Sequence, residues 1–150
     1  EIMISLIMVD VDNFKEINDR FGHHFGDQYL EQLGELLMRI LKRSTDFVVR
    51  YGGDEFLLVL FDTDSEGAMQ IAQKIKKETQ ALRIYDPRKS AVIETTCSIG
   101  VFSFIPTAGT MTKQVTKLVD EALYLAKREG KNRIVIHEEI MGVNDELELI

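Results

Sequence analysis

Cysteine is nearly absent from this sequence of 150 residues, in which Cys97 is the only one. A single thiol cannot form a disulfide within the chain and cannot build a cysteine zinc site. Such sparse use of cysteine is typical of proteins in a reducing compartment. We therefore expect a cytoplasmic localisation.

Positive charge is also in short supply. The chain carries 18 Lys and Arg against 25 Asp and Glu, which gives a formal net charge of −7. Proteins that bind nucleic acid or a membrane surface nonspecifically show a basic surplus, so the composition argues against both partners. It does not argue against a nucleotide enzyme, because such enzymes meet phosphate through metal ions that carboxylates hold.

Long hydrophobic runs are missing as well. The apolar run over 2–9 is far shorter than the roughly 20 residues that cross a bilayer, and it lacks the basic flank and cleavage site of a signal peptide. We expect no membrane insertion by this chain, although a region outside it could tether the full-length protein to a membrane.

The sequence is long enough for one domain with its own core. We expect this domain over 1–137 and a C-terminal extension over 138–150. Apolar spacing predicts strands and helices in alternation. The predicted strands cover 2–9, 47–51, 55–61, part of 92–104 with a break or bulge near Gly100, and 133–137. The predicted helices cover 14–21, 27–42, a segment that begins at Asp64 or Ser65, and a segment from a Thr112 cap to Gly130; residues 85–90 are expected to form a loop.

This order combines a hairpin with crossover helices, which favours an α+β fold: a largely antiparallel sheet with helices packed on it. The ferredoxin-like and polymerase-palm layouts belong to this class.

Two groups of carboxylates stand out. Asp10 and Asp12 follow the first predicted strand, and Asp54 and Glu55 follow the glycines of the predicted hairpin. Carboxylates at the end of a buried strand are costly unless a positive group accompanies them. Magnesium is the natural candidate, because it prefers oxygen ligands. The alternative is that these are solvated loop residues.

The hairpin residues Tyr51-Gly52-Gly53-Asp54-Glu55-Phe56 resemble the signature of the GGDEF family of diguanylate cyclases. Further segments resemble the family's other motifs in the same order. These are Asp10 to Lys15, Asn18 to His23 with Gly26-Asp27, Ser98 to Val101, Ala122 with Tyr124 to Lys127, and Gly130 to Asn132. The resemblance implies a ferredoxin-like, polymerase-palm-like nucleotide cyclase fold with a mostly antiparallel five-stranded sheet.

The resemblance also implies a reaction. Family members condense two GTP into cyclic di-GMP and two pyrophosphates, with Mg²⁺, or Mn²⁺ in its place, at two ions per half-site. The active form is a homodimer, and an upstream sensory or dimerisation domain controls it. By the same resemblance the metal would be held by Asp10, the Val11 carbonyl and Asp54. Asp54 would also act as the general base, beside Glu55 and the charge-stabilising Lys15. Substrate would be bound by Asn18, His23, Asp27, Gly52, Gly53, Lys127 and Lys131.

The residue types suit these roles. Metal ions can activate a hydroxyl nucleophile and neutralise a triphosphate, and lysines stabilise charge during phosphoryl transfer. An aspartate such as Asp27 can accept hydrogen bonds from N1–H and the 2-amino group of guanine, a donor pair that adenine lacks. Taken singly, these lysines and histidines could equally be solvated surface residues.

Arg43 and Asp46 have an RxxD spacing that resembles the family's inhibitory site for cyclic di-GMP, with Lys74 as a supporting residue. An arginine suits phosphates and guanine edges through its bidentate fork. The alternative is a surface ion pair at the end of a helix.

One departure concerns the N-terminal helix of the family, which is absent here and would normally cover part of the sheet. It leaves the activity of this piece open. Two other hypotheses therefore stand beside the enzyme: an inactive domain that binds GTP or cyclic di-GMP as a sensor, and a structural interaction domain.

Overall fold

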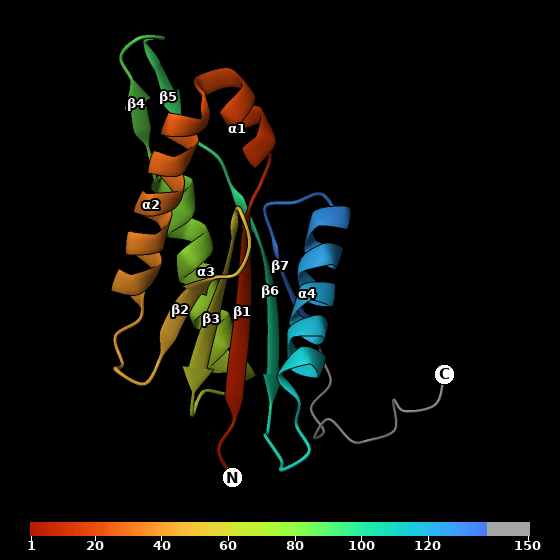
Figure 1. Cartoon of the computed structure of the whole chain (residues 1–150). Helices are drawn as coiled ribbons and strands as arrows, with labels where there is room; N and C mark the ends of the chain where they lie inside the picture. Colours follow the sequence, from red (N-terminus) through yellow and green to blue (C-terminus); the bar gives the residue numbers. More distant parts are fainter. Residues whose placement is uncertain (138–150) are drawn as a thin grey trace.

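The computed structural model describes residues 1–137. Its centre is a five-stranded sheet in the order β2-β3-β1-β6-β7 (Figure 1). All neighbouring strands are antiparallel except the parallel pair β6 and β7. The predicted α+β fold with a mostly antiparallel sheet is therefore confirmed. The strand bounds are Ile4–Val11 for β1, Phe47–Arg50 for β2, Glu55–Phe61 for β3, Cys97–Phe104 for β6 and Ile134–His137 for β7.

Helices cover both faces of this sheet (Figure 1). One face packs against α2 (His23–Ile40) and α3 (Ser65–Ala81), with α1 (Phe14–Phe21) beside α2; the other face packs against α4 (Thr112–Arg128). Alternate residues of β1 point to opposite faces, so Ile7 and Val9 contribute to the first core and Leu6 and Met8 to the second. All four are almost fully buried, as expected for a central strand.

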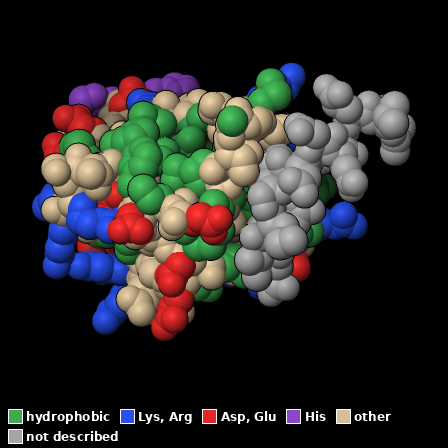
Figure 2. All heavy atoms as spheres, turned by 90° about the horizontal axis from the view of Figure 1, so that it is seen from below, with side chains coloured by type: hydrophobic (Ala, Val, Ile, Leu, Met, Phe, Trp, Pro, Cys, Tyr) green, Lys and Arg blue, Asp and Glu red, His purple; other side chains and the backbone are tan. Residues whose placement is uncertain are grey.

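Helix α4 packs on β6, β7 and β1. On the same side of the sheet, Phe47, Val49 and Phe61 of the remaining strands are 46%, 41% and 36% exposed. Seen from the end at which the chain begins, hydrophobic side chains form a continuous area on one side of the molecule (Figure 2). The second core is thus smaller and less completely covered than the first.

Strand β1 has the predicted length of eight residues but lies two residues further along the chain. It continues to Val11, and Asp10 lies within the sheet, opposite Glu55 of β3 and Ser98 of β6. The prediction stopped at the first carboxylate because a charged residue usually ends a buried strand. Here backbone pairing on both sides carries the strand past it.

The loop predicted over 85–90 was partly wrong. Residues Ile84–Asp86 form β4, which pairs with β5 (Ala91–Ile93) in a separate two-stranded sheet. The two strands are held by the buried pair Ile84 and Ile93. Such short strands leave too little alternation for a sequence pattern to reveal them.

The predicted bulge at Gly100 is also wrong, because β6 pairs with β1 in unbroken register. A Cβ at position 100 would lie 2.5 Å from the Leu123 nitrogen and 2.6 Å from the Val119 oxygen, both backbone atoms of α4. Glycine is therefore needed for the close approach of the helix.

The helix ends were predicted with mixed success. Asp64 caps α3, since its Oδ1 accepts a hydrogen bond from the Gly67 amide at 2.8 Å. Thr112 does not cap α4: it is the first helical residue, and the Met111 carbonyl accepts hydrogen bonds from the Gln114 and Val115 amides. Gly130 follows α4 with φ 126°, and the Lys131 amide donates to the Ala126 carbonyl at 3.0 Å, a Schellman-type ending.

The second helix begins at His23 rather than at residue 27, because Gly22, with φ 90°, turns the chain directly from α1 into α2. None of the helices within 1–137 combines the length and apolarity needed to cross a membrane. The predicted extension over 138–150 lies outside the described residues.

Candidate active site

Asp10 is the buried carboxylate of this site. It is 2% exposed, and its Oδ2 accepts a hydrogen bond from Lys127 Nζ of α4. Its Oδ1 is also buried and has no hydrogen-bond partner among the described residues. A buried carboxylate oxygen without a partner is costly, so this position favours a bound cation.

The pKa values of Asp10 and Lys127 reflect the same shortage of positive charge around Asp10. Burial raises the pKa of Asp10 to about 7; the hydrogen bond and charge of Lys127 oppose this rise, and the negative charges of Asp54 and Glu55 add to it. Burial lowers the pKa of Lys127, but the hydrogen bond and charge of Asp10 outweigh that effect and raise it. The single positive charge of Lys127 therefore does not neutralise the carboxylates of Asp10, Asp54 and Glu55.

The glycine turn is held tightly against β1. The amides of Tyr51 and Gly52 both donate to the Glu55 carbonyl, at 2.9 and 3.3 Å, and the Val11 amide donates to the Asp54 carbonyl at 3.3 Å. This pairing of β1 with β3 places Asp54 next to the end of β1 that carries Asp10, as the sequence predicts.

Arg50 adds a contact that the sequence analysis missed. Its guanidinium donates two hydrogen bonds, at 3.2 and 2.5 Å, to the Gly53 carbonyl and so braces the turn. An arginine before a glycine turn is too common a pattern to reveal such a role. The two glycines also differ. A Cβ at Gly52 would come within 3.2 Å of Glu55 Oε2, whereas Gly53 faces open space.

These groups suit magnesium. Within residues 1–137 no cluster of three or more His, Cys, Asp or Glu side chains is arranged to hold a metal ion. Magnesium does not require one, because it is usually bound by one or two carboxylates plus substrate phosphates and water. Asp10 and Asp54, with the Val11 carbonyl, fit that donor set, and the free Oδ1 of Asp10 is the observation that supports it.

Asp12 behaves differently from Asp10, although the sequence presents the two as a pair. Its Oδ1 accepts from the Ser98 hydroxyl at 2.6 Å, and its Oδ2 accepts from the Thr96 hydroxyl at 2.6 Å and the Asn132 amide at 3.0 Å. Neutral donors therefore satisfy this buried carboxylate. The expectation that both aspartates need a positive partner is wrong for Asp12.

Two of the predicted guanine-binding residues lie near the junction of α1 and α2. Asn18 lies against Gly26, where a Cβ would come within 1.9 Å of Asn18 Oδ1, and this oxygen is buried without a partner among the described residues. Asp27 is exposed one residue further along. It lines a groove of about 660 Å³ whose other walls include Leu30, Val48 and Phe56. His23 is exposed at the start of α2.

The predicted phosphate-binding lysines are placed unequally. Lys127 contacts Asp10 near the end of β1, and Lys131 Nζ donates to Asn13 Oδ1, just beyond this strand, at 2.6 Å, so both reach the C-terminal end of β1. Lys15 is exposed on the first turn of α1 and makes no hydrogen bond that would hold its side chain in the described structure.

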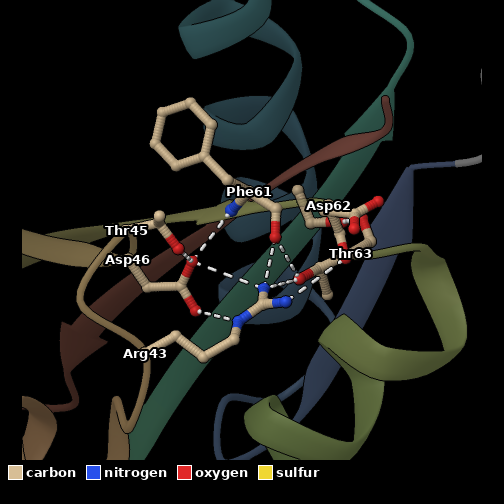
Figure 3. Close-up of polar contacts among 7 residues, drawn as sticks. Arg43, Thr45, Asp46, Phe61, Asp62 and Thr63 are labelled. Carbon is tan, nitrogen blue, oxygen red and sulfur yellow. Dashed lines mark hydrogen bonds and ion pairs between the residues drawn. The ribbon is translucent and has the colours of Figure 1, made fainter. Parts of the chain in front are cut away.

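Arg43 and Asp46 form a joint at the other end of β3 (Figure 3). Arg43 Nε donates to Asp46 Oδ2 at 3.1 Å, and the guanidinium also donates to the Phe61 and Asp62 carbonyls and to the Thr63 hydroxyl. Asp46 Oδ1 accepts from the Phe61 amide at 3.0 Å. The pair is thus more than a surface ion pair. Lys74 is exposed on α3 and takes no part in these contacts.

Comparison with known proteins agrees with this geometry. The family model described as "Diguanylate cyclase, GGDEF domain" matches residues 2–133. The chain belongs to the GGDEF domain family. The resemblance drawn from the motifs is therefore confirmed.

Among curated GGDEF proteins, the chain is 37% identical over 137 residues to Diguanylate cyclase A of Treponema denticola, covering 89% of this chain and 35% of that protein. It is 35% identical over 131 residues to Diguanylate cyclase DosC of Escherichia coli K12, covering 87% of this chain and 28% of that protein. The chain thus spans about a third of the length of these relatives.

Solved structures of GGDEF domains share the fold. The GGDEF domain of DgcB from Caulobacter crescentus, solved in complex with c-di-GMP, matches with a TM-score of 0.83 at 27% identity, over 92% of this chain and 80% of that chain. The active GGEEF domain of a diguanylate cyclase from Vibrio cholerae matches with a TM-score of 0.80 at 33% identity, over 91% and 84% of the two chains.

Proposed function

We propose that this domain is a diguanylate cyclase, which condenses two GTP into cyclic di-GMP and two pyrophosphates. The supporting observation is the buried Oδ1 of Asp10, which has no partner in the described part of the chain and lies beside Asp54 at the glycine turn, where a divalent cation and a triphosphate would sit. Two of its curated relatives, from Treponema denticola and Escherichia coli, bear the name diguanylate cyclase.

Mg²⁺ or Mn²⁺, bound by Asp10, Asp54 and the Val11 carbonyl, would supply charge neutralisation for the triphosphate and acidify the attacking hydroxyl. Asp54 takes the proton from the 3′-hydroxyl as general base. Lys127 and Lys131 face the same segment as Asp10 and would bind the phosphates, while Lys15, which is free to move, would reach the reacting phosphate. We assign no specific step to Glu55, which lies opposite Asp10 and adds negative charge near it.

Guanine would bind at the junction of α1 and α2. Asp27 accepts hydrogen bonds from N1–H and the 2-amino group, Asn18 contributes its amide, and His23 lies at the rim. The rejection of ATP follows, because adenine would leave the Asp27 carboxylate facing no donor. Gly52 and Gly53 let the phosphates approach the turn.

Catalysis requires two copies of the domain. One half-site positions one GTP, and each 3′-hydroxyl must attack the α-phosphate of the GTP that the other copy holds. We therefore propose a homodimer as the active form, brought together by a sensory or dimerisation domain elsewhere in the full-length protein. We also propose that cyclic di-GMP inhibits the enzyme by binding at Arg43 and Asp46, with support from Lys74.

The test is product formation from GTP with Mg²⁺, followed by chromatography. We expect Asp54→Asn to abolish cyclic di-GMP while leaving the thermal unfolding temperature unchanged, because the amide can neither accept the proton nor bind the cation well. Asp54→Glu is the matched control and should retain activity, as in the active GGEEF domain of Vibrio cholerae.

Cyclisation by the Asn variant would refute the role of Asp54. If the unmodified domain binds GTP but forms no product even when fused to a dimerising helix, the protein is a binding module and not an enzyme.

A further inference from the structure

We infer that Asp12 is a positioning residue, which clamps the turn over 130–132 to the end of β1 and thereby aims Lys131 at the phosphate site. The effect on phosphate binding rests on the proposed function, whereas the clamp on the turn rests on geometry alone.

Asp12 joins three segments that are far apart in the sequence. Its carboxylate binds the Thr96 and Ser98 hydroxyls at the start of β6 and the Asn132 amide beyond α4. Its backbone completes the joint: the Asp12 amide donates to the Thr96 carbonyl at 2.9 Å, and its carbonyl accepts from the Thr95 hydroxyl at 2.8 Å. Because Asp12 is 2% exposed, water cannot replace these partners at low cost.

The turn that Asp12 holds is conformationally unfavourable. Lys131 and Asn132 both adopt left-handed backbone angles, with φ of 63° and 48°, directly after Gly130. Non-glycine residues persist in this region only where surrounding contacts impose it. The Asn132 amide bond to Asp12 is such a contact, and the Asn132 side chain is held from the other side by Gln80 at 2.9 Å.

The clamp sets the direction of one lysine. With the turn in place, Lys131 Nζ reaches Asn13 Oδ1 at 2.6 Å, and Asn13 is itself left-handed with φ 56°. The ammonium group is thus delivered to the segment that immediately follows Asp10 and Asp12. If Asp12 were removed, the turn would relax toward ordinary backbone angles and Lys131 would point elsewhere.

A carboxylate is well suited to this task because it can accept several hydrogen bonds at once and has no donor that would need a partner. An asparagine could keep most of these hydrogen bonds: its oxygen can replace Oδ2, and its side-chain amide can donate to the Ser98 hydroxyl, which can rotate to accept. An alanine would keep none of the side-chain hydrogen bonds. A ligand of magnesium would behave differently, because replacement by asparagine would then be almost as harmful as replacement by alanine.

The clamp is tested by residue-resolved hydrogen exchange of the Asn132 amide, corrected for global stability. We expect Asp12→Ala to accelerate this exchange by about tenfold or more, because the amide loses its acceptor, and Asp12→Asn to leave it near the unmodified value. Ser5→Ala is the matched control. Ser5 is buried at the opposite end of β1 and bonds Thr63 and Ser103, so its loss weakens the sheet without touching the turn. Unchanged exchange in Asp12→Ala would overturn the inference.

The consequence is tested by calorimetric binding of 3′-deoxy-GTP with Mg²⁺, a probe that cannot cyclise. Partners that orient the ligands of a metal typically change affinity or activity by about 10- to 100-fold when lost, and we expect an effect of this order for a partner that orients a phosphate-binding lysine. We expect roughly tenfold weaker binding for Asp12→Ala, near-normal binding for Asp12→Asn and Ser5→Ala, and no further loss when Asp12→Ala is added to Lys131→Ala.

Full affinity in Asp12→Ala, or an additive loss in the double variant, would refute the positioning role. If the unmodified protein failed to bind the probe, the proposed function would fall, and the exchange measurement would still decide whether Asp12 holds the turn.

Discussion

The two ends of β3 hold their charges in opposite ways. At the Glu55 end, Asp10 is buried with one oxygen that has no partner within residues 1–137, and the negative charges of Asp54 and Glu55 lie close enough to raise its pKa. At the Phe61 end, Arg43 and Asp46 bind each other and the backbone of the strand (Figure 3), and Asp46 has only 3% of its side chain exposed.

This difference separates a site that needs an added positive charge from one whose charges are already paired within the fold. Buried polar groups without partners are rare in folded proteins, because each one lowers the free energy of unfolding. Where such a group is a carboxylate with further carboxylates beside it, as at Asp10, a cation-binding role explains it better than packing does. Where each charge is satisfied from within, its removal should cost stability first. The predictions below test this contrast.

Replacing Asp10 should produce the largest effect. We expect Asp10→Asn to lower cyclic di-GMP formation by about a thousandfold or more, because the cation loses a ligand in the site where charge develops. The same change should stabilise the metal-free domain above about pH 7, since a buried charge is removed. Denaturant unfolding and product assays on the same samples measure both.

The pKa of Asp10 determines how the stability of the protein changes with pH. The pKa of Asp10 rises from 3.8 to about 7 on folding. Between these values the unfolded chain has lost the proton while the folded protein keeps it, so stability falls as pH rises. Relative to Asp10→Asn, the free energy of unfolding of the unmodified protein should fall by on the order of 2–4 kcal/mol between about pH 4 and pH 7. It should fall no further above about pH 7. A difference that did not vary with pH would show that burial does not raise this pKa.

Replacing Arg43 should have the opposite profile. We expect Arg43→Ala to lower the free energy of unfolding by roughly 1–3 kcal/mol, because Asp46 and the Phe61 carbonyl lose a charged donor. Initial turnover of GTP should persist, and inhibition by cyclic di-GMP should be relieved. Lys42→Ala, at the exposed neighbouring position, should change stability by no more than about 0.5 kcal/mol.

Two results would contradict this account of Arg43. Unaltered stability would show that its contacts are incidental, and unaltered inhibition would remove the proposed feedback site.

Replacing Gly26 should have the smallest effect of the three, and one confined to the nucleotide end. The added methyl group of Gly26→Ala would displace the Asn18 side chain, whose Oδ1 lies 1.9 Å from the Cβ position. We expect the KM for GTP to rise by about tenfold, the loss typical of one hydrogen bond in a binding site, with little change in kcat. Gly34→Ala is the control on the same helix, where the nearest atom, Cε1 of Phe56, is 3.4 Å away. An unchanged KM would argue against guanine contact by Asn18.

Most of the secondary structure could be predicted from the sequence, and the failures have physical causes. The helices and the five main strands follow from apolar spacing, which records the face that each element buries. The β4–β5 hairpin was missed because three-residue strands carry almost no periodicity. Gly100 was misread because a glycine in a strand can mark either a bulge or a close neighbour, and only α4 decides between them.

The candidate site divides in the same way. The motifs placed Asp10, Asp54 and the lysines in one neighbourhood. They assigned the metal to Asp10 and no contact to Asp12, and they revealed neither the hydrogen bonds that satisfy Asp12 nor Arg50 as the brace of the turn. Whether a carboxylate is free or satisfied depends on donors from β6 and from the turn after α4, and these lie more than eighty residues away in the chain.

The sequence by itself determined the helices, the strands of the main sheet and the family of the domain, because local periodicity and motif spacing are properties of the chain. Only the tertiary structure decided which charges are left unpaired. Hydrogen-bond satisfaction is settled by atoms that folding brings together, and that is why Asp10 and Asp12, so alike in the sequence, differ in what they can bind.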